Sequence, residues 1–281
     1  MEFRNGLSVK PKEVLRSGQV VFTDGTNDVT PNQTDCEAYG YTYNHRTRTC
    51  EAYSYTMRVQ QAISNETNTI KGAGNKTETG TNNTLLIGEN NIVKGESRNN
   101  IIVGNNNEIV NGINNVGVYG TLAQATVSNS IVLGGNSGSD SLSERQSIQL
   151  LYGTQTTQGV TEHSYLNNIT DNYFTIPDNC AMYFHADVLA LRVGGTDTSG
   201  GGAVGDFASW VERGVVLNAS GVLRIERERN AIKNSGHTTN WAPTAVVSGT
   251  DFIIDVKGHA DTTIEWCSNI TFTQIKTSVA L

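Results

Sequence analysis

The residues of this sequence best suited to chemistry are its four cysteines and five histidines, together with its scattered carboxylates. Cys36 and Cys50 open two matching hexamers, CEAYGY and CEAYSY. Apolar and aromatic residues alternate in both hexamers around the polar stretch NHRTRT, so the pattern predicts a hairpin with two structural cysteines, either reduced or disulfide-linked. A zinc site built from Cys36, Cys50 and His45 is the alternative, although the usual close spacing of cysteine ligands is absent.

Catalytic motifs give a weaker signal. Glycoside hydrolysis needs two carboxylates at a productive separation. The histidines lack metal-ligand spacing, and the sequence contains neither a G-x-S-x-G elbow nor a phosphate-binding loop. In the Asn-rich middle of the chain, the acidic residues stand singly: Glu78, Glu89, Glu96 and Glu108. We therefore expect a protein that is not an enzyme and that uses no cofactor and no metal ion.

The overall composition indicates a water-soluble chain. It has 281 residues, of which 37% are hydrophobic and 17% charged, with a net charge of −7. Basic residues are outnumbered and form no stripe, which argues against nucleic-acid binding. No stretch approaches the roughly 20 apolar residues of a membrane-spanning helix. The N-terminal sequence MEFRNGLSVKPKEVLRSG has no apolar core of a secretory signal, so neither membrane insertion nor standard secretion is expected.

A repeat organises the middle of the chain. Short apolar clusters end in glycine at intervals of 16, 16, 16 and 14 residues, and asparagines stand before nearly all of these clusters. A fixed period of this kind indicates a solenoid, whose coils stack on one another. Glycine and asparagine tolerate the left-handed backbone of sharp corners, and stacked asparagines form side-chain ladders. The expected turn positions are Gly72, Gly88, Gly104, Gly120 and Gly134.

A coil with so few residues is too thin to bury a large core. With two short strands per coil, roughly two or three apolar side chains per strand face inward, so several chains are expected to pack together, most simply as a trimer. Coils such as NNTLLIGENNIVKG, over about residues 66 to 136, resemble the left-handed parallel β-roll in the head domains of trimeric bacterial adhesins of the YadA type. This module also occurs in bacteriophage fibres, and the resemblance implies an intertwined homotrimer.

The C-terminal half has the alternation of half-buried antiparallel strands. In DFIIDVKG, Phe252, Ile254 and Val256 share one face, and in TIEWCSNITF the residue Trp266 falls on the apolar face, which predicts a β-sandwich with Trp266 in its core. Trp210 in GDFASW and Trp241 in TTNWAP lie near turn residues. Exposed aromatic side chains there suit contact with a carbohydrate or protein receptor, and packing at the sandwich edge is the alternative.

The order of short motifs in this half carries a second resemblance. The motifs ERQ, IP before a long strand ending in ALR, WVERG, and a closing VKG and TIEW are similar in order to a C-terminal domain of phage tail-fibre and neck-appendage proteins. That family pattern has a second Arg after ALR, where this chain has Val193, so the following loop is expected to differ.

These patterns together predict an all-β protein: a short left-handed parallel β-roll or β-solenoid shaft followed by an antiparallel β-sandwich. Residues 1–64 form an N-terminal virion-docking segment, with a short helix at YTMRVQQAIS, residues 65–137 the shaft, and residues 138–281 the distal domain. The resemblances imply a homotrimeric tail fibre of a phage virion, assembled in the host cytoplasm, that contacts a host surface glycan or protein. The alternative is a structural capsid, neck or tail fibre or adaptor whose distal domain binds other virion proteins.

Overall fold

The computed structural model describes residues 3, 6–15, 18–52, 67–135, 141–197, 202–235, 238 and 240–281. The chain divides into two compact units, Met1–Glu66 and Thr67–Leu281. The expected segment boundaries after residues 64 and 137, and the expected helix at residues 55–64, lie outside the described residues. Within the described residues, no helix has both the length and the apolar character needed to cross a membrane.

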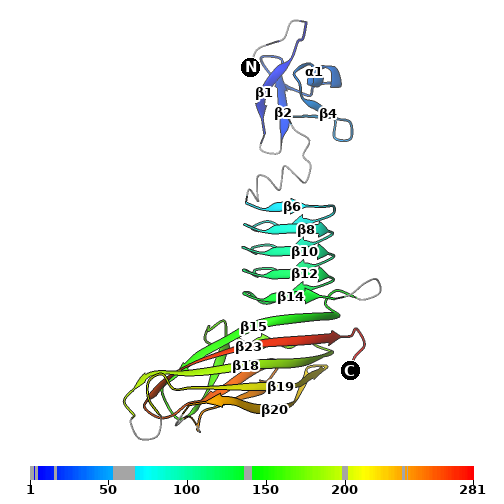
Figure 1. Ribbon diagram of the computed structural model, residues 1–281. Helices are drawn as coiled ribbons and strands as arrows, with labels where there is room; N and C mark the ends of the chain where they lie inside the picture. Colours follow the sequence, from blue (N-terminus) through cyan, green and yellow to red (C-terminus); the bar gives the residue numbers. More distant parts are fainter. Residues whose placement is uncertain are drawn as a thin grey trace. The chain divides into compact units, whose positions relative to one another are not determined.

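The first unit is a small antiparallel sheet with one short helix (Figure 1). Its buried core contains Val20 and Phe22 beside Cys36 and Cys50, which form a disulfide. The hairpin prediction was wrong for the first hexamer, because Asn32 caps a helix there by accepting a hydrogen bond from the N–H of Asp35. The elements are β1 (Lys10–Val14), β2 (Gln19–Thr23), β3 (Asp28–Val29), α1 (Gln33–Ala38), β4 (Thr42–Asn44) and β5 (Thr49–Glu51).

The second unit begins with the coil region, residues 67–135, which is the predicted β-solenoid. Parallel strands pair at the predicted period, so that Leu85 lies beside Ile101, Ile101 beside Gly117, and Gly117 beside Ile131. One sheet contains β6 (Thr69–Lys71), β8 (Leu85–Glu89), β10 (Ile101–Asn105), β12 (Gly117–Thr121) and β14 (Ile131–Gly134). The other contains β7 (Lys76–Thr77), β9 (Ile92–Val93), β11 (Glu108–Ile109) and β13 (Gln124–Ala125).

The C-terminal region, residues 141–281, continues the first sheet of the coil region. Strand β14 pairs antiparallel with β15, so the coil strands and the long C-terminal strands share one hydrogen-bonded sheet (Figure 1). Beyond β14 this sheet runs through β15 (Arg145–Thr156), β23 (Thr262–Lys276), β18 (Cys180–Gly195), β19 (Phe207–Ala219) and β20 (Val222–Asn234).

Four shorter strands cover one face of these long strands, and the aromatic core lies between. Phe252 on β22 has its ring centroid 5.0 Å from those of both Phe184 and Phe272. The predicted alternation is confirmed, since Phe252, Ile254 and Val256 are fully buried. The covering strands are β16 (Thr161–Leu166), β17 (Phe174–Thr175), β21 (Ala242–Ser248) and β22 (Asp251–Lys257).

The loop expected to differ after ALR follows a β-bulge in β18 at residues 192–194. Arg192 is buried there, and its guanidinium donates to the carbonyl oxygens of Gly194, Asp197 and Gly202. A buried guanidinium satisfied by backbone carbonyls fixes the start of the glycine-rich loop, since an unpaired buried charge would be costly.

Candidate functional site

The two tryptophans expected at a receptor contact lie in the core. Trp210 is 7% exposed and Trp241 is 2% exposed, and both rings lie against Trp266, with centroid distances of 5.7 and 6.4 Å. The expectation of exposed aromatic side chains at these positions was therefore wrong. The turn residues beside them misled the prediction, because burial is decided by the strands that pack around each ring and not by its neighbours in the sequence.

The repeated glycines of the coil region make its corners possible. Gly72, Gly88, Gly104 and Gly120 all have positive φ, between 97° and 141°. A Cβ added to Gly104 would also overlap the carbonyl oxygen of Gly120 in the next coil. Glycine is required for two reasons. Residues with a side chain rarely adopt this backbone conformation, and the neighbouring coils are too close to leave room for a Cβ atom. Gly134 differs, because it has no positive φ and pairs with β15.

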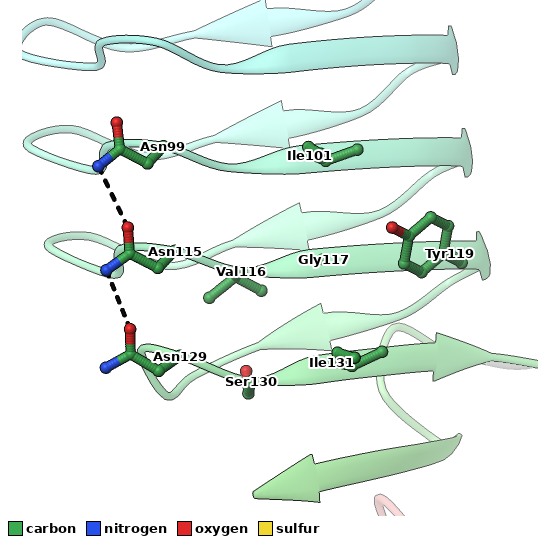
Figure 2. Close-up of a pocket in the computed structure, with 9 residues that line it drawn as sticks. All are labelled: Asn99, Ile101, Asn115, Val116, Gly117, Tyr119, Asn129, Ser130 and Ile131. Carbon is green, nitrogen blue, oxygen red and sulfur yellow. Dashed lines mark hydrogen bonds between the residues drawn. The ribbon is translucent and has the colours of Figure 1, made fainter. Parts of the chain in front are cut away.

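Asparagines connect successive coils in two ladders. In the exposed ladder, the side-chain Nδ2 of Asn99 donates to Oδ1 of Asn115 at 3.1 Å, and Asn115 donates to Asn129 at 2.9 Å (Figure 2). All three have positive φ, between 57° and 58°. In the buried ladder, Asn107 Nδ2 donates to Asn91 Oδ1 at 3.0 Å. The ladders predicted from the repeat are confirmed.

The interior of each coil is thinner than expected, with one large apolar side chain buried per strand in place of two or three. The coil containing Ile102 and Ile109 buries both side chains completely, and its strand residues on either side of Ile102 point outward. Two large apolar side chains make a small core for one coil. The other apolar residues of the strand lie on the outside of the coil.

The outward residues of β10, β12 and β14 form an exposed apolar patch, which we call the coil face. Figure 2 shows Ile101, Tyr119 and Ile131 on successive strands beside the exposed asparagine ladder. A hollow of about 490 Å³ opens over Gly117, whose missing side chain makes room for the Tyr119 ring. The exposed members are Ile101 (40%), Val103 (37%), Tyr119 (40%), Ile131 (45%) and Leu133 (49%).

Polar residues bound the coil face at both ends of the sheet. In the register of the strands, Leu133 is followed by Ser147 on β15 and then by Thr273 on β23. At the other end, the corresponding position on β6 is Lys71. The patch on the coils ends at these positions, and exposed apolar side chains resume farther along the same face of the sheet at Tyr183, Leu189, Leu191 and Val215. The signal that sequence reasoning missed is the unbroken apolar runs IIV and IVL, because a strand with one wetted face would alternate.

Two of the four carboxylates of the coil region, Glu78 and Glu108, make structural contacts, while Glu89 and Glu96 are exposed. Glu108 accepts a hydrogen bond from Gln124 and lies 3.0 Å from Lys94, and Glu78 accepts from the N–H of Gly95. Sequence reasoning missed a different acid, Glu212 on β19, which is completely buried. Its carboxylate oxygens lie 3.9 Å from nitrogens of Arg227 and Arg229, and burial, opposed by Arg227, raises its pKa above the ordinary value. A buried acid with raised pKa affects stability as a function of pH.

Comparisons with known proteins return phage tailspikes. No family model and no curated protein matches the chain. The chain is similar to the tailspike of Acinetobacter baumannii phage AM24, with 10% identity, a TM-score of 0.28, and coverage of 75% of this chain and 49% of that one. It is similar to the tailspike of Acinetobacter phage vB_ApiP_P1, with 12% identity, a TM-score of 0.21, and coverage of 75% and 49%.

A third similar structure is the tailspike gp49 of Acinetobacter baumannii bacteriophage Fri1, described as a capsular polysaccharide depolymerase. Its identity is 8% and its TM-score 0.24, with coverage of 73% of this chain and 46% of that one. The present chain thus spans about half the length of the solved structures it matches.

The depolymerase among these structures contradicts the expectation that the present protein is not an enzyme, and we withdraw that expectation. Two carboxylates that act on a glycosidic bond need a certain separation in space, and no fixed separation in sequence. A missing motif therefore excluded nothing.

Proposed function

We propose that this protein is an appendage of a tailed-phage virion that forms a homotrimer through its coil face and binds polysaccharide on the host surface. The observation that carries the proposal is the row of large apolar side chains, 37% to 49% exposed, that follows the outside of the coils. Soluble chains rarely leave a contiguous apolar patch open to water, and such patches mark interaction surfaces.

Copies of this chain are the partners that fit the patch. If copies lie side by side with their coils at the same level, the apolar row of each copy meets the same row of its neighbours, and β10, β12 and β14 are all covered. Full burial of a Val, Leu or Ile side chain stabilises by roughly 1.5–3 kcal/mol. Since each exposed member is already more than half buried, closing the face contributes about 1 kcal/mol per residue, or roughly 5 kcal/mol per copy.

We assign roles to the remaining parts from their resemblance to phage fibre proteins and from their order along the chain. The N-terminal unit, residues 1–66, attaches the fibre to tail, neck or capsid proteins of the virion, and the C-terminal region meets the host glycan. Three copies of a weak glycan site on one rigid stalk raise the effective affinity without a strong single site. The two-layer packing of the C-terminal strands supports the predicted β-sandwich, which gives the stalk a rigid tip.

The test is binding to bacterial cells. Labelled full-length protein is incubated with a panel of capsule-typed strains and with matched mutants that lack the surface polysaccharide. Binding that requires the polysaccharide and competes with phage adsorption supports the proposal. Binding to none of the strains, with capture by purified virion proteins, supports the structural adaptor instead. Release of reducing sugar during the same incubation measures any depolymerase activity.

A further inference from the structure

A groove lies where the last coil meets the C-terminal region, and its volume is about 410 Å³. One wall is the turn at residues 126–129, and the other is the segment from Leu166 to Pro177. We call it the Tyr173 groove. Of the residues that line it, Asn129 alone also lines the hollow on the coil face, so the groove lies around the corner from the surface that we assign to assembly.

Hydrogen bonds hold both walls in place. Asn167 Nδ2 donates to the carbonyl oxygen of Ser128 at 3.0 Å, which ties the C-terminal wall to the coil. The N–H of Phe174 donates to Oη of Tyr152, and that hydroxyl donates to the carbonyl oxygen of Phe252, so the backbone next to Tyr173 is anchored in the core. A groove with fixed walls loses little entropy when it binds a ligand.

The lining combines one aromatic ring with uncharged polar groups. Tyr173 lines the groove together with Asn167, Asn172 and Thr126, and the exposed Ile169 forms an apolar rim. The ring of Tyr173 is held by the rings of His163 and Tyr165, at centroid distances of 6.0 and 5.8 Å. None of the described residues that line the groove carries a formal charge. A pyranose ring presents an apolar C–H face and hydroxyl edges. An aromatic ring can support that face, and amides can both donate to and accept from the hydroxyls.

The charges near the groove are negative. Burial raises the pKa of Tyr173, and its neighbours Tyr165, Asp171, Asp255 and Asp251 raise it further, so the phenol stays neutral. Asp255 is paired with His163, and Asp251 accepts a hydrogen bond from Thr175. Negative charges near a binding site repel an anionic ligand, and they do so more strongly where water is excluded. These carboxylates disfavour acidic sugars.

We propose that the Tyr173 groove binds uncharged sugar units of the host polysaccharide, with the ring of Tyr173 against the sugar face and the asparagine amides on its hydroxyls. This inference rests on the proposed function and adds to it a location and a ligand class. It predicts recognition that does not depend on carboxylate groups of the polysaccharide.

The test uses the full chain and the surface polysaccharide that the wild-type protein binds. Affinity is measured by biolayer interferometry for the wild type, Tyr173→Ala and Ile169→Ser, with Val222→Ala as control. Val222 is 60% exposed at the start of β20, outside the groove. We expect at least tenfold weaker binding for Tyr173→Ala, about threefold weaker for Ile169→Ser, and no change for the control. Because Ile169 is 56% exposed, its variant keeps the fold even if Tyr173→Ala does not.

A second measurement tests the ligand class. The same polysaccharide is treated to reduce its carboxyl groups to alcohols, and wild-type binding is measured again. Unchanged affinity supports recognition of uncharged units, whereas loss of binding overturns it. If the wild type binds no polysaccharide, the proposed function fails. If the wild type binds and both groove variants bind equally well, the proposed function stands and the groove assignment is wrong.

Discussion

The buried asparagine ladder offers the sharpest test of what holds the coils together. Asn107 is 1% exposed, its Nδ2 donates to Asn91 Oδ1 at 3.0 Å and to the carbonyl oxygen of Gly120 at 2.8 Å, and its Oδ1 accepts from the N–H of Ala123 at 2.9 Å. The change Asn107→Ala removes these three bonds and leaves the N–H of Ala123, a buried residue, and the carbonyl of Gly120, an exposed residue, without this partner. Each buried group left unsatisfied costs about 1–3 kcal/mol.

The buried N–H of Ala123 contributes about 1–3 kcal/mol and the lost bond to the exposed Gly120 about 1 kcal/mol, so the expected loss of unfolding free energy for Asn107→Ala is roughly 2–4 kcal/mol. For a unit of this size, that corresponds to a fall of the thermal midpoint by on the order of 10 °C. The matched control is Asn99→Gly, which removes a rung of the exposed ladder and keeps the positive φ of Asn99 accessible. Water replaces those bonds, so the control is expected to lose about 1 kcal/mol or less.

The assay is thermal and denaturant unfolding followed by circular dichroism at one fixed chain concentration, because an oligomer's midpoint depends on concentration. If Asn107→Ala loses no more stability than Asn99→Gly, the buried ladder does not hold the coils, and the reasoning from unsatisfied groups is refuted.

Three further predictions follow from the same structure. Gly104→Ala should lower the thermal midpoint far more than Gly112→Ala, because a Cβ at Gly104 overlaps the next coil whereas Gly112 faces open space, and equal shifts would contradict this. Reducing the Cys36–Cys50 disulfide, whose cysteines are separated by 14 positions, should destabilise the N-terminal unit by about 3 kcal/mol, and calorimetry should show an unchanged transition for the second unit. Burial raises the pKa of Glu212, so the folded chain keeps that proton to higher pH than the unfolded chain, and stability falls as pH rises between the two pKa values. Glu212→Gln should remove this fall and be at least as stable as the wild type at pH 8, and lower stability there would show that the Arg pairing outweighs burial.

Much of the fold was predictable because local rules decide it. The repeat period determined the coil register, and the glycine and asparagine positions marked the corners, since each reflects a backbone conformation open to few residue types. Strand alternation likewise placed Phe252 and Trp266 in the core.

The functional surfaces were less predictable, because they depend on which strands meet in space. Trp210 sits near turn residues in the sequence, yet it stacks on Trp266, which belongs to a distant part of the chain. The walls of the Tyr173 groove come from the last coil and from the later segment between Leu166 and Pro177, and no local pattern links them. The α1 helix replaced the expected strand because one capping residue outweighed an alternation confined to a single hexamer.

The central claim is that copies of this chain assemble through the coil face, and solution mass tests it most directly. Light scattering of the full-length protein should give three times the 30.3 kDa chain mass. The double change Ile101→Asp with Leu133→Asp places carboxylates on the coil face and should give a folded monomer, while Val222→Asp should remain a trimer. A monomeric wild type, or a face variant that keeps the trimer mass, would contradict the account.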